Sequence, residues 1–235
     1  MQLALDAVRV EGRRAPLLEA VSLRLATGEC VLVAGDPGQG HTALALVATG
    51  RIAPFQGTVT LVDDEGRPVP SPATLRAVTA VVDLPGVSEP DDVLTVATVV
   101  AESLALARRS ALPGAASRWL AERGLTERAG ERMDDLFGPV RTALLAALAT
   151  ERERVRFLVL TLPDRHGGEP AGWWDVARTL ATAGYGVLVQ CTRSSARDLG
   201  AVLPPAEGAR ARRATPLEAL REGSVAAATE LGAAG

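Results

Sequence analysis

Apolar residues recur at every second position in the first part of the chain. Leu3, Leu5 and Ala7 show this spacing, and residues 21–25 show it again after the turn EGRRAP. A period of two is typical of β-strands that bury one of their two faces. The pattern therefore predicts an antiparallel β portion at the start of the chain.

Three later segments are apolar at almost every position, namely residues 30–34, 157–160 and 186–191. Such continuous runs are typical of strands with both faces buried, as in parallel sheets. Two further strands are expected at residues 57–62, in a hairpin through the turn DDEGRPV, and at residues 77–82.

Helical spacing, with apolar residues three and four positions apart, characterises much of the remaining chain. We expect helices at residues 42–48, 141–149 and 173–183, and a largely helical stretch at 94–132 that breaks near the sequence LPG. Another helix is predicted to begin at TPLE, residues 215–218, which offers a cap, a proline and an acid in the preferred order.

Strands that alternate with helices predict an α/β fold, here with an N-terminal antiparallel β portion and a helical subdomain inserted at about residues 94–140. No repeat or flexible linker interrupts the chain, so we expect one domain over residues 1–235. A chain of this length can bury a substantial core.

The composition restricts the possible functions of the protein more than it restricts the possible folds. All 25 basic residues are arginine, the net charge is −3 and only 3% of residues are aromatic, so a nucleic-acid partner is not expected. No apolar run approaches the ~20 residues that span a bilayer, and the start lacks the pattern of a signal peptide. Cys30 and Cys191 lie in apolar strands, which predicts buried, reduced thiols in a cytoplasmic protein.

The octapeptide GDPGQGHT has the frame of the phosphate-binding loop G-x-x-x-x-G-K-[ST]. It follows a predicted buried strand and precedes a predicted helix, which is the context that this motif requires. Gly35, Gly38 and Gly40 keep the shape of a loop that could bind nucleotide, and Thr42 keeps a hydroxyl that could meet Mg²⁺. His41 stands where the motif has lysine.

His41 changes the chemistry of this loop. A histidine with an ordinary pKa is mostly neutral at pH 7, and it is shorter than lysine. Asp36 adds an acid where an anion would sit. Each such change of charge at contact distance costs on the order of 1–4 kcal/mol. We interpret the loop as the relic of a nucleotide site, and a role for His41 as a pH-dependent phosphate ligand stays open as the alternative.

The order of these pieces resembles the ATP-binding cassette of ABC transporters from about residue 3 to residue 222. The segments that carry the resemblance are LLEAVSLRLATGECVLVAGDPGQGHTALALVATGRIAPFQGTVTL, DDVLTVATVVAESL, GLTERAGERMDDLFG, TALLAALA and TPLEAL. The resemblance implies a P-loop NTPase fold, ATP and Mg²⁺ as ligands, and a membrane permease as partner.

Residues at the family's catalytic positions differ in this chain. Thr161 and Leu162 stand where the family has an aspartate for Mg²⁺ and a glutamate that orients water. Asp164 lies three residues beyond the metal position and is interpreted as a solvated turn residue, although a shift of register stays open. Asp83 replaces the switch glutamine, and Thr192 replaces the histidine after the third strand.

The family's signature motif, L-S-G-G-Q, survives as Leu136, Phe137 and Gly138. In the family its serine and glycine N–H groups hold the γ-phosphate of the opposite subunit's ATP. Phe137 has no hydroxyl and Pro139 has no N–H. His166 lies in the same turn as Asp164, and it is not expected to bind a metal without cysteine or acid partners.

Three functional hypotheses follow. The first is a pseudo-ATPase that serves as a structural or regulatory subunit of a membrane transporter, peripheral to the inner face of the membrane. The resemblance implies head-to-tail dimers in which each ATP touches the glycine loop of one subunit and the signature motif of the other. A chain that is altered in its loop and in its signature would therefore disable both ATP sites of such a dimer. The second is an atypical working ATPase that uses His41, Thr42 and Asp164. The third is a nucleotide-independent interaction module.

The sequence leaves open whether the chain pairs with itself or with another cassette. The resemblance implies that a permease helix would dock on the loop after Val82 and on the helical stretch 94–109. Thr95 is predicted to cap the helix in that stretch. Its apolar positions have helical spacing; they are Val96, Val99, Val100, Ser103 and Leu104.

Overall fold

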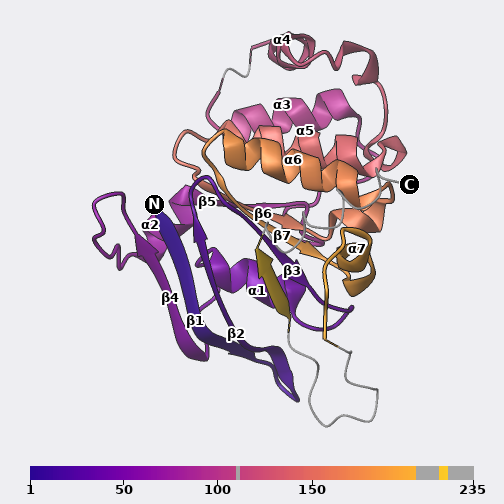
Figure 1. Cartoon of the computed structure of the whole chain (residues 1–235). Helices are drawn as coiled ribbons and strands as arrows, with labels where there is room; N and C mark the ends of the chain where they lie inside the picture. The colour runs from indigo at the N-terminus through magenta and orange to yellow at the C-terminus, as the bar shows by residue number, and fades with distance from the viewer. Residues whose placement is uncertain (110–111, 205–216, 222–235) are drawn as a thin grey trace.

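The computed structural model describes residues 1–109, 112–204 and 217–221. Two β-sheets form its framework (Figure 1): a three-stranded sheet with the order β2-β1-β4 and a five-stranded sheet with the order β5-β6-β7-β3-β8. The strands are β1 Gln2–Glu11, β2 Pro16–Ala26, β3 Cys30–Ala34, β4 Gln56–Val62, β5 Thr79–Val82, β6 Phe157–Thr161, β7 Gly186–Cys191 and β8 Glu218–Arg221.

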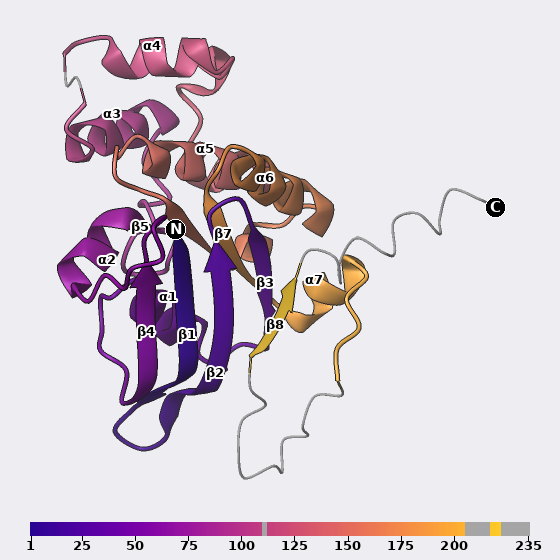
Figure 2. The same ribbon diagram turned by 60° about the vertical axis from the view of Figure 1, so that its left-hand side comes forward.

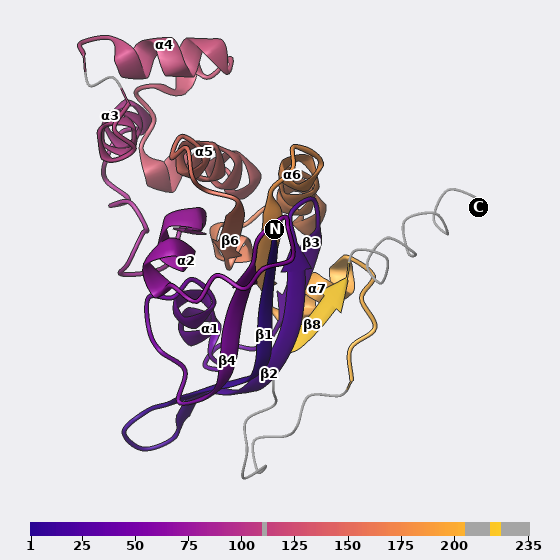
Figure 3. The same ribbon diagram turned by 90° about the vertical axis from the view of Figure 1, so that its left-hand side faces the viewer.

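The helices are arranged in layers around the five-stranded sheet. Helix α1 packs between the two sheets, α5 and α6 cover the opposite face of the five-stranded sheet, and α3 and α4 stack beyond α5 (Figures 2 and 3). The helices are α1 His41–Ala48, α2 Pro72–Val78, α3 Val96–Leu106, α4 Ala115–Glu122, α5 Gly138–Thr150, α6 Pro170–Thr182 and α7 Arg193–Asp198. Short 3-10 turns are η1 Thr126–Arg128, η2 Met133–Asp135 and η3 Pro163–His166.

The predicted N-terminal β portion is the three-stranded antiparallel sheet, with one difference in its alternation. Leu3 and Leu5 are buried as expected, but Ala7 is exposed, and the alternation resumes at Val8. A β-bulge at Ala7, whose φ is 46°, inserts an extra residue and reverses the faces that follow. Gly57 on β4 accommodates it, since a Cβ there would lie 2.4 Å from the Ala7 carbonyl oxygen.

The predicted hairpin after residue 57 is short. Strand β4 pairs with β1, and the turn that follows β4 closes through one isolated bridge between Val62 and Pro68. The strand expected from residue 77 begins only at Thr79. Ser71 caps a helix before it, accepting a hydrogen bond from the Thr74 backbone N–H at 3.3 Å, so residues 72–78 form α2.

The three apolar runs are the buried parallel strands β3, β6 and β7. The prediction of a helix near the end of the chain is wrong within the described residues, because Glu218–Arg221 is a strand antiparallel to β3. Thr215 and Pro216 lie outside the described residues. Pairing with β8 satisfies the backbone groups along the edge of β3, and a helix cannot do that.

The predicted helical stretch contains α3, α4 and the 3-10 turn η1. Thr95 caps α3 as expected, accepting a hydrogen bond from the Thr98 N–H at 3.3 Å. The apolar side of α3 faces the core of the protein itself, where Val99, Val100 and Leu104 are buried. These side chains therefore do not form the partner surface that the spacing suggested. No helix within the described ranges is long and apolar enough to cross a membrane.

Candidate functional site

The glycine loop joins β3 to α1 at the edge where the parallel strands end. Gly38 and Gly40 have φ values of 89° and 101°, a conformation that favours glycine. A Cβ on Gly40 would also lie 2.4 Å from the carbonyl oxygen of Leu17 on β2. The Gln39 side chain folds over the loop, and its Oε1 accepts the Asp36 N–H at 2.7 Å. One loop N–H is therefore taken by the chain's own amide oxygen.

His41 is buried at the start of α1. Its Nε2 lies 3.3 Å from the carbonyl oxygen of Cys191, which fits a ring that donates from Nε2. Burial lowers the pKa of His41, although the Cys191 carbonyl and the nearby Asp164 and Asp36 act in the opposite direction. The ring is therefore neutral at pH 7 and supplies no cation in place of the lysine. Gln190 supports the turn by donating to the His41 carbonyl oxygen at 2.9 Å.

A cavity of about 740 Å³ opens between the glycine loop, α1, the start of β2 and the residues after β6 and β7. It brings the neighbours His41 and Thr42 together with Asp164 and Thr192, which come from two distant segments of the sequence. Much of its wall is apolar; these residues are Pro16, Leu17, Pro37, Ala43, Leu46, Ile52 and Leu162. Its polar wall is formed by Thr42, Asp164, Arg165, Thr192 and Ser195.

Asp164 is not the solvated turn residue that the sequence suggested. Its Oδ2 accepts three hydrogen bonds, from the Thr192 N–H at 2.8 Å and from the hydroxyls of Thr192 and Ser195, both at 2.7 Å. The η3 turn brings Asp164 to the start of α7, where Thr192 is the cap residue. This contact joins two segments at the carboxyl ends of β6 and β7, and local sequence did not indicate it.

The two residues at the predicted catalytic positions, the last residue of β6 and the one that follows it, carry no carboxylate. Thr161 is buried, and its Oγ1 has no hydrogen-bond partner within the described residues. Leu162 has a φ of 48° and contributes an apolar side chain to the cavity. Neither residue can take a proton from water or orient it as a carboxylate would.

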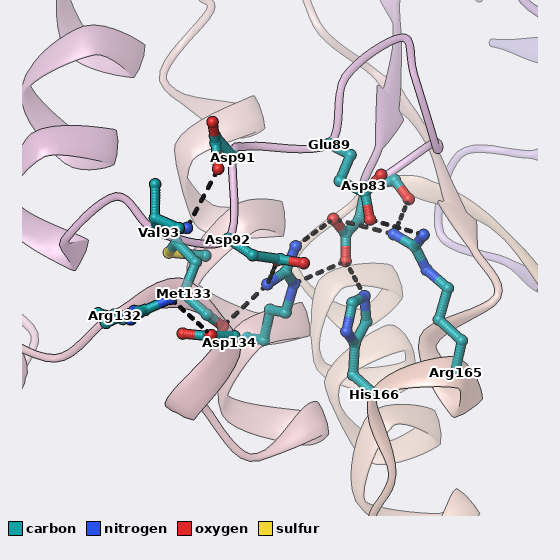
Figure 4. A network of polar contacts seen from close by, with 11 residues as sticks. Asp83, Glu89, Asp91, Asp92, Val93, Arg132, Met133, Asp134, Arg165 and His166 are labelled. Atoms are coloured by element: carbon teal, nitrogen blue, oxygen red, sulfur yellow. Dashed lines mark hydrogen bonds and ion pairs between the residues drawn. The ribbon is translucent and has the colours of Figure 1, made fainter.

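A second polar cluster surrounds Asp83, the residue at the predicted switch position. Arg141 on α5 is fully buried and binds both carboxylate oxygens of Asp83, with Nε–Oδ2 and Nη2–Oδ1 distances of 3.0 and 3.1 Å. Figure 4 shows Arg165 and His166 approaching Asp83 from the turn after β6. Their distances to Asp83 are 3.2 Å for Arg165 Nη2–Oδ1 and 2.9 Å for His166 Nε2–Oδ2.

The outer part of this cluster reaches the helical layer. Arg141 Nη1 donates to the Asp92 carboxylate at 2.9 Å and to the Met133 carbonyl oxygen at 2.8 Å. Arg165 Nη1 lies 2.7 Å from Glu89 Oε1. Arg141 therefore connects the loop after β5, the helix α5 and the η2 turn through one guanidinium group.

The cluster holds Asp83 in its ionised form. Burial opposes ionisation, but the close contacts with His166 and Arg141 and the charges of Arg141 and Arg165 outweigh it and lower the pKa of Asp83 to about 2. Oxygen and nitrogen atoms of Asp83, Glu89 and His166 come within 4.8 Å of one another, so His166 does have acid neighbours, which corrects the sequence analysis. Two guanidinium groups already compensate these acids, and we assign no metal there.

The three residues predicted to be a signature remnant lie at the start of α5. Leu136 is buried, and Gly138 begins α5 so close to the turn after β6 that a Cβ would lie 2.2 Å from the Gly167 carbonyl oxygen. Phe137 is 56% exposed and sits at the cap position of α5. Arg141 is the functional candidate that the sequence analysis missed. Its signal was a charged residue inside an apolar helical pattern.

The chain is similar to known proteins over part of its sequence and over most of its fold. No family model matches the sequence. A segment of 78 residues is 37% identical to the taurine import ATP-binding protein TauB of Mesorhizobium japonicum, covering 32% of this chain and 29% of that protein. The match thus spans less than one third of the length of the curated relative.

Solved structures with the same architecture are ATP-binding cassettes. An ATP-binding subunit of an ABC transporter superposes with a TM-score of 0.57 at 18% identity, covering 84% of this chain and 82% of that one. A dimeric bacterial ABC transporter cassette gives a TM-score of 0.60 at 18% identity, covering 83% and 90%.

The chain has an α/β fold of the P-loop NTPase type, with a glycine loop between β3 and α1. Within that class, the chain has the fold of the ATP-binding cassettes of ABC transporters, as the sequence resemblance implied.

Proposed function

We propose that this protein is a pseudo-ATPase of the ABC cassette type, a structural or regulatory subunit that a permease holds at the inner face of the membrane. The proposal takes residues 1–235 as one cassette-like domain with a helical subdomain at about 94–140. A match to an ATP-binding transport subunit over part of the chain and the cassette fold support the subunit role. Fold alone does not define activity, so the site carries the argument.

The observation that carries the proposal is the chemistry of the cavity at the glycine loop. Phosphoryl transfer needs cations around the phosphates and a group that orients the attacking water. Here a neutral, buried His41 replaces the cation and Leu162 stands at the water-orienting position. Gly35, Gly38, Gly40 and Thr42 remain as a frame without these two groups.

ATP should bind weakly to the purified chain, and more tightly as the pH falls below 6.5. The pKa of His41 is lowered from its ordinary value, so the ring gains its proton only in acid, where it begins to attract phosphate. Asp36→Asn should strengthen binding at every pH, because it removes an acid beside the loop. Calorimetry with ATP and Mg²⁺ at pH 5.5 and pH 8 measures both effects, with Asp6→Asn on β1 as control. Tight ATP binding at pH 8 that does not change with Asp36→Asn would contradict our interpretation of the loop.

The partner surface is expected on the exposed side of the loop after β5. Val87 and Val93 are 53% and 60% exposed there, whereas Val100 is fully buried and would only report on folding. Val87→Asp should reduce recovery of a multi-spanning membrane protein from detergent-solubilised membranes by about tenfold, as for an interface anchor. Val202→Asp, at a 92% exposed position after α7, is the matched control.

This pull-down also separates the remaining hypotheses. A permanent subunit should be recovered equally with and without ATP. Recovery that rises steeply with ATP would favour the atypical ATPase, for which the shared position of His41, Thr42 and Asp164 on one cavity is the supporting observation. Recovery of no membrane protein would favour the nucleotide-independent interaction module. Pairing with a second copy or with another cassette would appear as a cassette-sized band.

A further inference from the structure

The cavity at the glycine loop is large, although within the described residues its walls lack the loop lysine and the water-orienting carboxylate that ATP hydrolysis requires. Its volume of about 740 Å³ lies within the range of small-molecule sites, roughly 300–1,000 Å³. Such sites combine apolar walls with a few fixed polar groups. Leu17, Leu46 and Ile52 belong to its apolar wall, and Asp164, Thr192 and Ser195 form its polar end.

The polar end offers hydrogen-bond acceptors and few donors. Thr192 and Ser195 each have one hydroxyl proton, and both protons are directed to Asp164 Oδ2 at 2.7 Å. The Thr192 N–H is directed to the same oxygen at 2.8 Å. Thr192 Oγ1 also accepts the Ser195 backbone N–H at 3.3 Å. The remaining lone pairs of the two hydroxyls can only accept hydrogen bonds, so this end favours a ligand that donates them.

The charges around the cavity also favour a ligand that donates hydrogen bonds, because they favour a positively charged one. His41 is neutral at pH 7 because burial lowers its pKa. Arg165 also lines the cavity, but its Nη2 donates to the Asp83 carbonyl oxygen at 2.6 Å and its Nη1 pairs with Glu89 at 2.7 Å. Asp164 therefore remains as the charged group of the polar end that no cation compensates within the described residues. A cationic ligand suits this end, and a phosphate or carboxylate would be repelled.

We propose that this cavity binds an organic ammonium ion with an apolar body, the ammonium group lying at Asp164, Thr192 and Ser195 and the body against the apolar wall. Ammonium groups carry only donors, which matches an end made of acceptors. The proposal is independent of the permease role, since it concerns a ligand other than nucleotide.

The test compares probes of equal size and different charge on the full chain. Phenethylammonium should bind about tenfold more tightly than phenethyl alcohol, as expected for a hydrogen bond that gains a charge, and phenylpropionate should bind more weakly than either. Binding is followed by NMR shifts of the protein at pH 7. Asp164→Asn should abolish the preference for the ammonium and leave the affinity for the alcohol unchanged. Asp175→Asn on α6, outside the cavity, should change nothing.

A second variant keeps the test decisive if Asp164→Asn does not fold. Thr42→Trp places a large ring at an exposed position that lines the cavity, so it should eliminate binding of both the ammonium and the alcohol. The proposal is overturned by equal affinity for ammonium and alcohol, or by tighter binding of phenylpropionate or MgATP. Binding of phenethylammonium that is undetectable at about 10 mM, or unaffected by Thr42→Trp, would overturn it as well.

Discussion

Replacing Arg141 with methionine should lower the free energy of unfolding by about 3 kcal/mol, the cost of removing one partner from a buried ion pair. The substitution leaves Asp83 buried and removes the guanidinium that binds both of its carboxylate oxygens. Arg165 and His166 still contact Asp83, which is why we expect the lower end of the known range. Urea denaturation followed by circular dichroism measures the change.

Arg67→Met is the matched control for this prediction. Arg67 pairs with Asp63 at 3.0 Å, the same distance as the Arg141–Asp83 pair, but its side chain is 71% exposed. Exposed pairs of this kind contribute about 1 kcal/mol or less. Equal effects of the two substitutions would show that the Asp83 cluster does not hold the helical layer to the sheet. Adding Asp83→Asn to Arg141→Met should recover part of the loss, because the unpaired buried charge is then removed.

ATP hydrolysis by the purified chain should not rise above the background of the assay. Ordinary ATPases turn over at about 1 s⁻¹ or faster, which requires a cation at the phosphates and a group that orients water. A phosphate-release assay at pH 6 and pH 8 tests this, and the lower pH gives His41 its best opportunity to act as a cation. Turnover near 1 s⁻¹ in the unmodified protein would refute the pseudo-ATPase proposal.

Single restorations should not create activity either. Leu162→Glu returns a carboxylate to the position after β6, and His41→Lys returns a cation to the loop. Each leaves the other proposed defect in place, and neither changes Phe137 at the predicted signature position. Because groups that act as one unit are strongly non-additive, either change alone should leave the rate at background. A large rate from Leu162→Glu alone would mean that the loop still binds ATP productively.

Much of the architecture follows from local patterns. The continuous apolar runs at residues 30–34 and 186–191 have few alternatives to a buried parallel strand, and a glycine loop after such a strand has a limited set of conformations. Thr95 caps its helix because its hydroxyl satisfies an N–H three residues away. In these cases the interacting groups are close in sequence, so the local sequence pattern is enough to predict the structure.

The differences arise where the deciding partner is distant in sequence. Glu218–Arg221 is a strand because the edge of β3 needs backbone partners, and the local cap signal could not show that need. Ala7 faces solvent because a bulge matches β1 to its neighbours. Val100 faces the core because α3 packs against α4 and α5.

The chemistry of the site divides in the same way. Sequence by itself determined which functional groups exist: a histidine instead of lysine at position 41, a leucine instead of glutamate at position 162, and a glycine loop before α1. Tertiary structure alone decided their partners. It placed Asp164 against Thr192 and Ser195, and it placed Asp83 against an arginine 58 positions away. Hydrogen bonds and charges act over a few ångströms in space, so their effects become defined only when the chain folds.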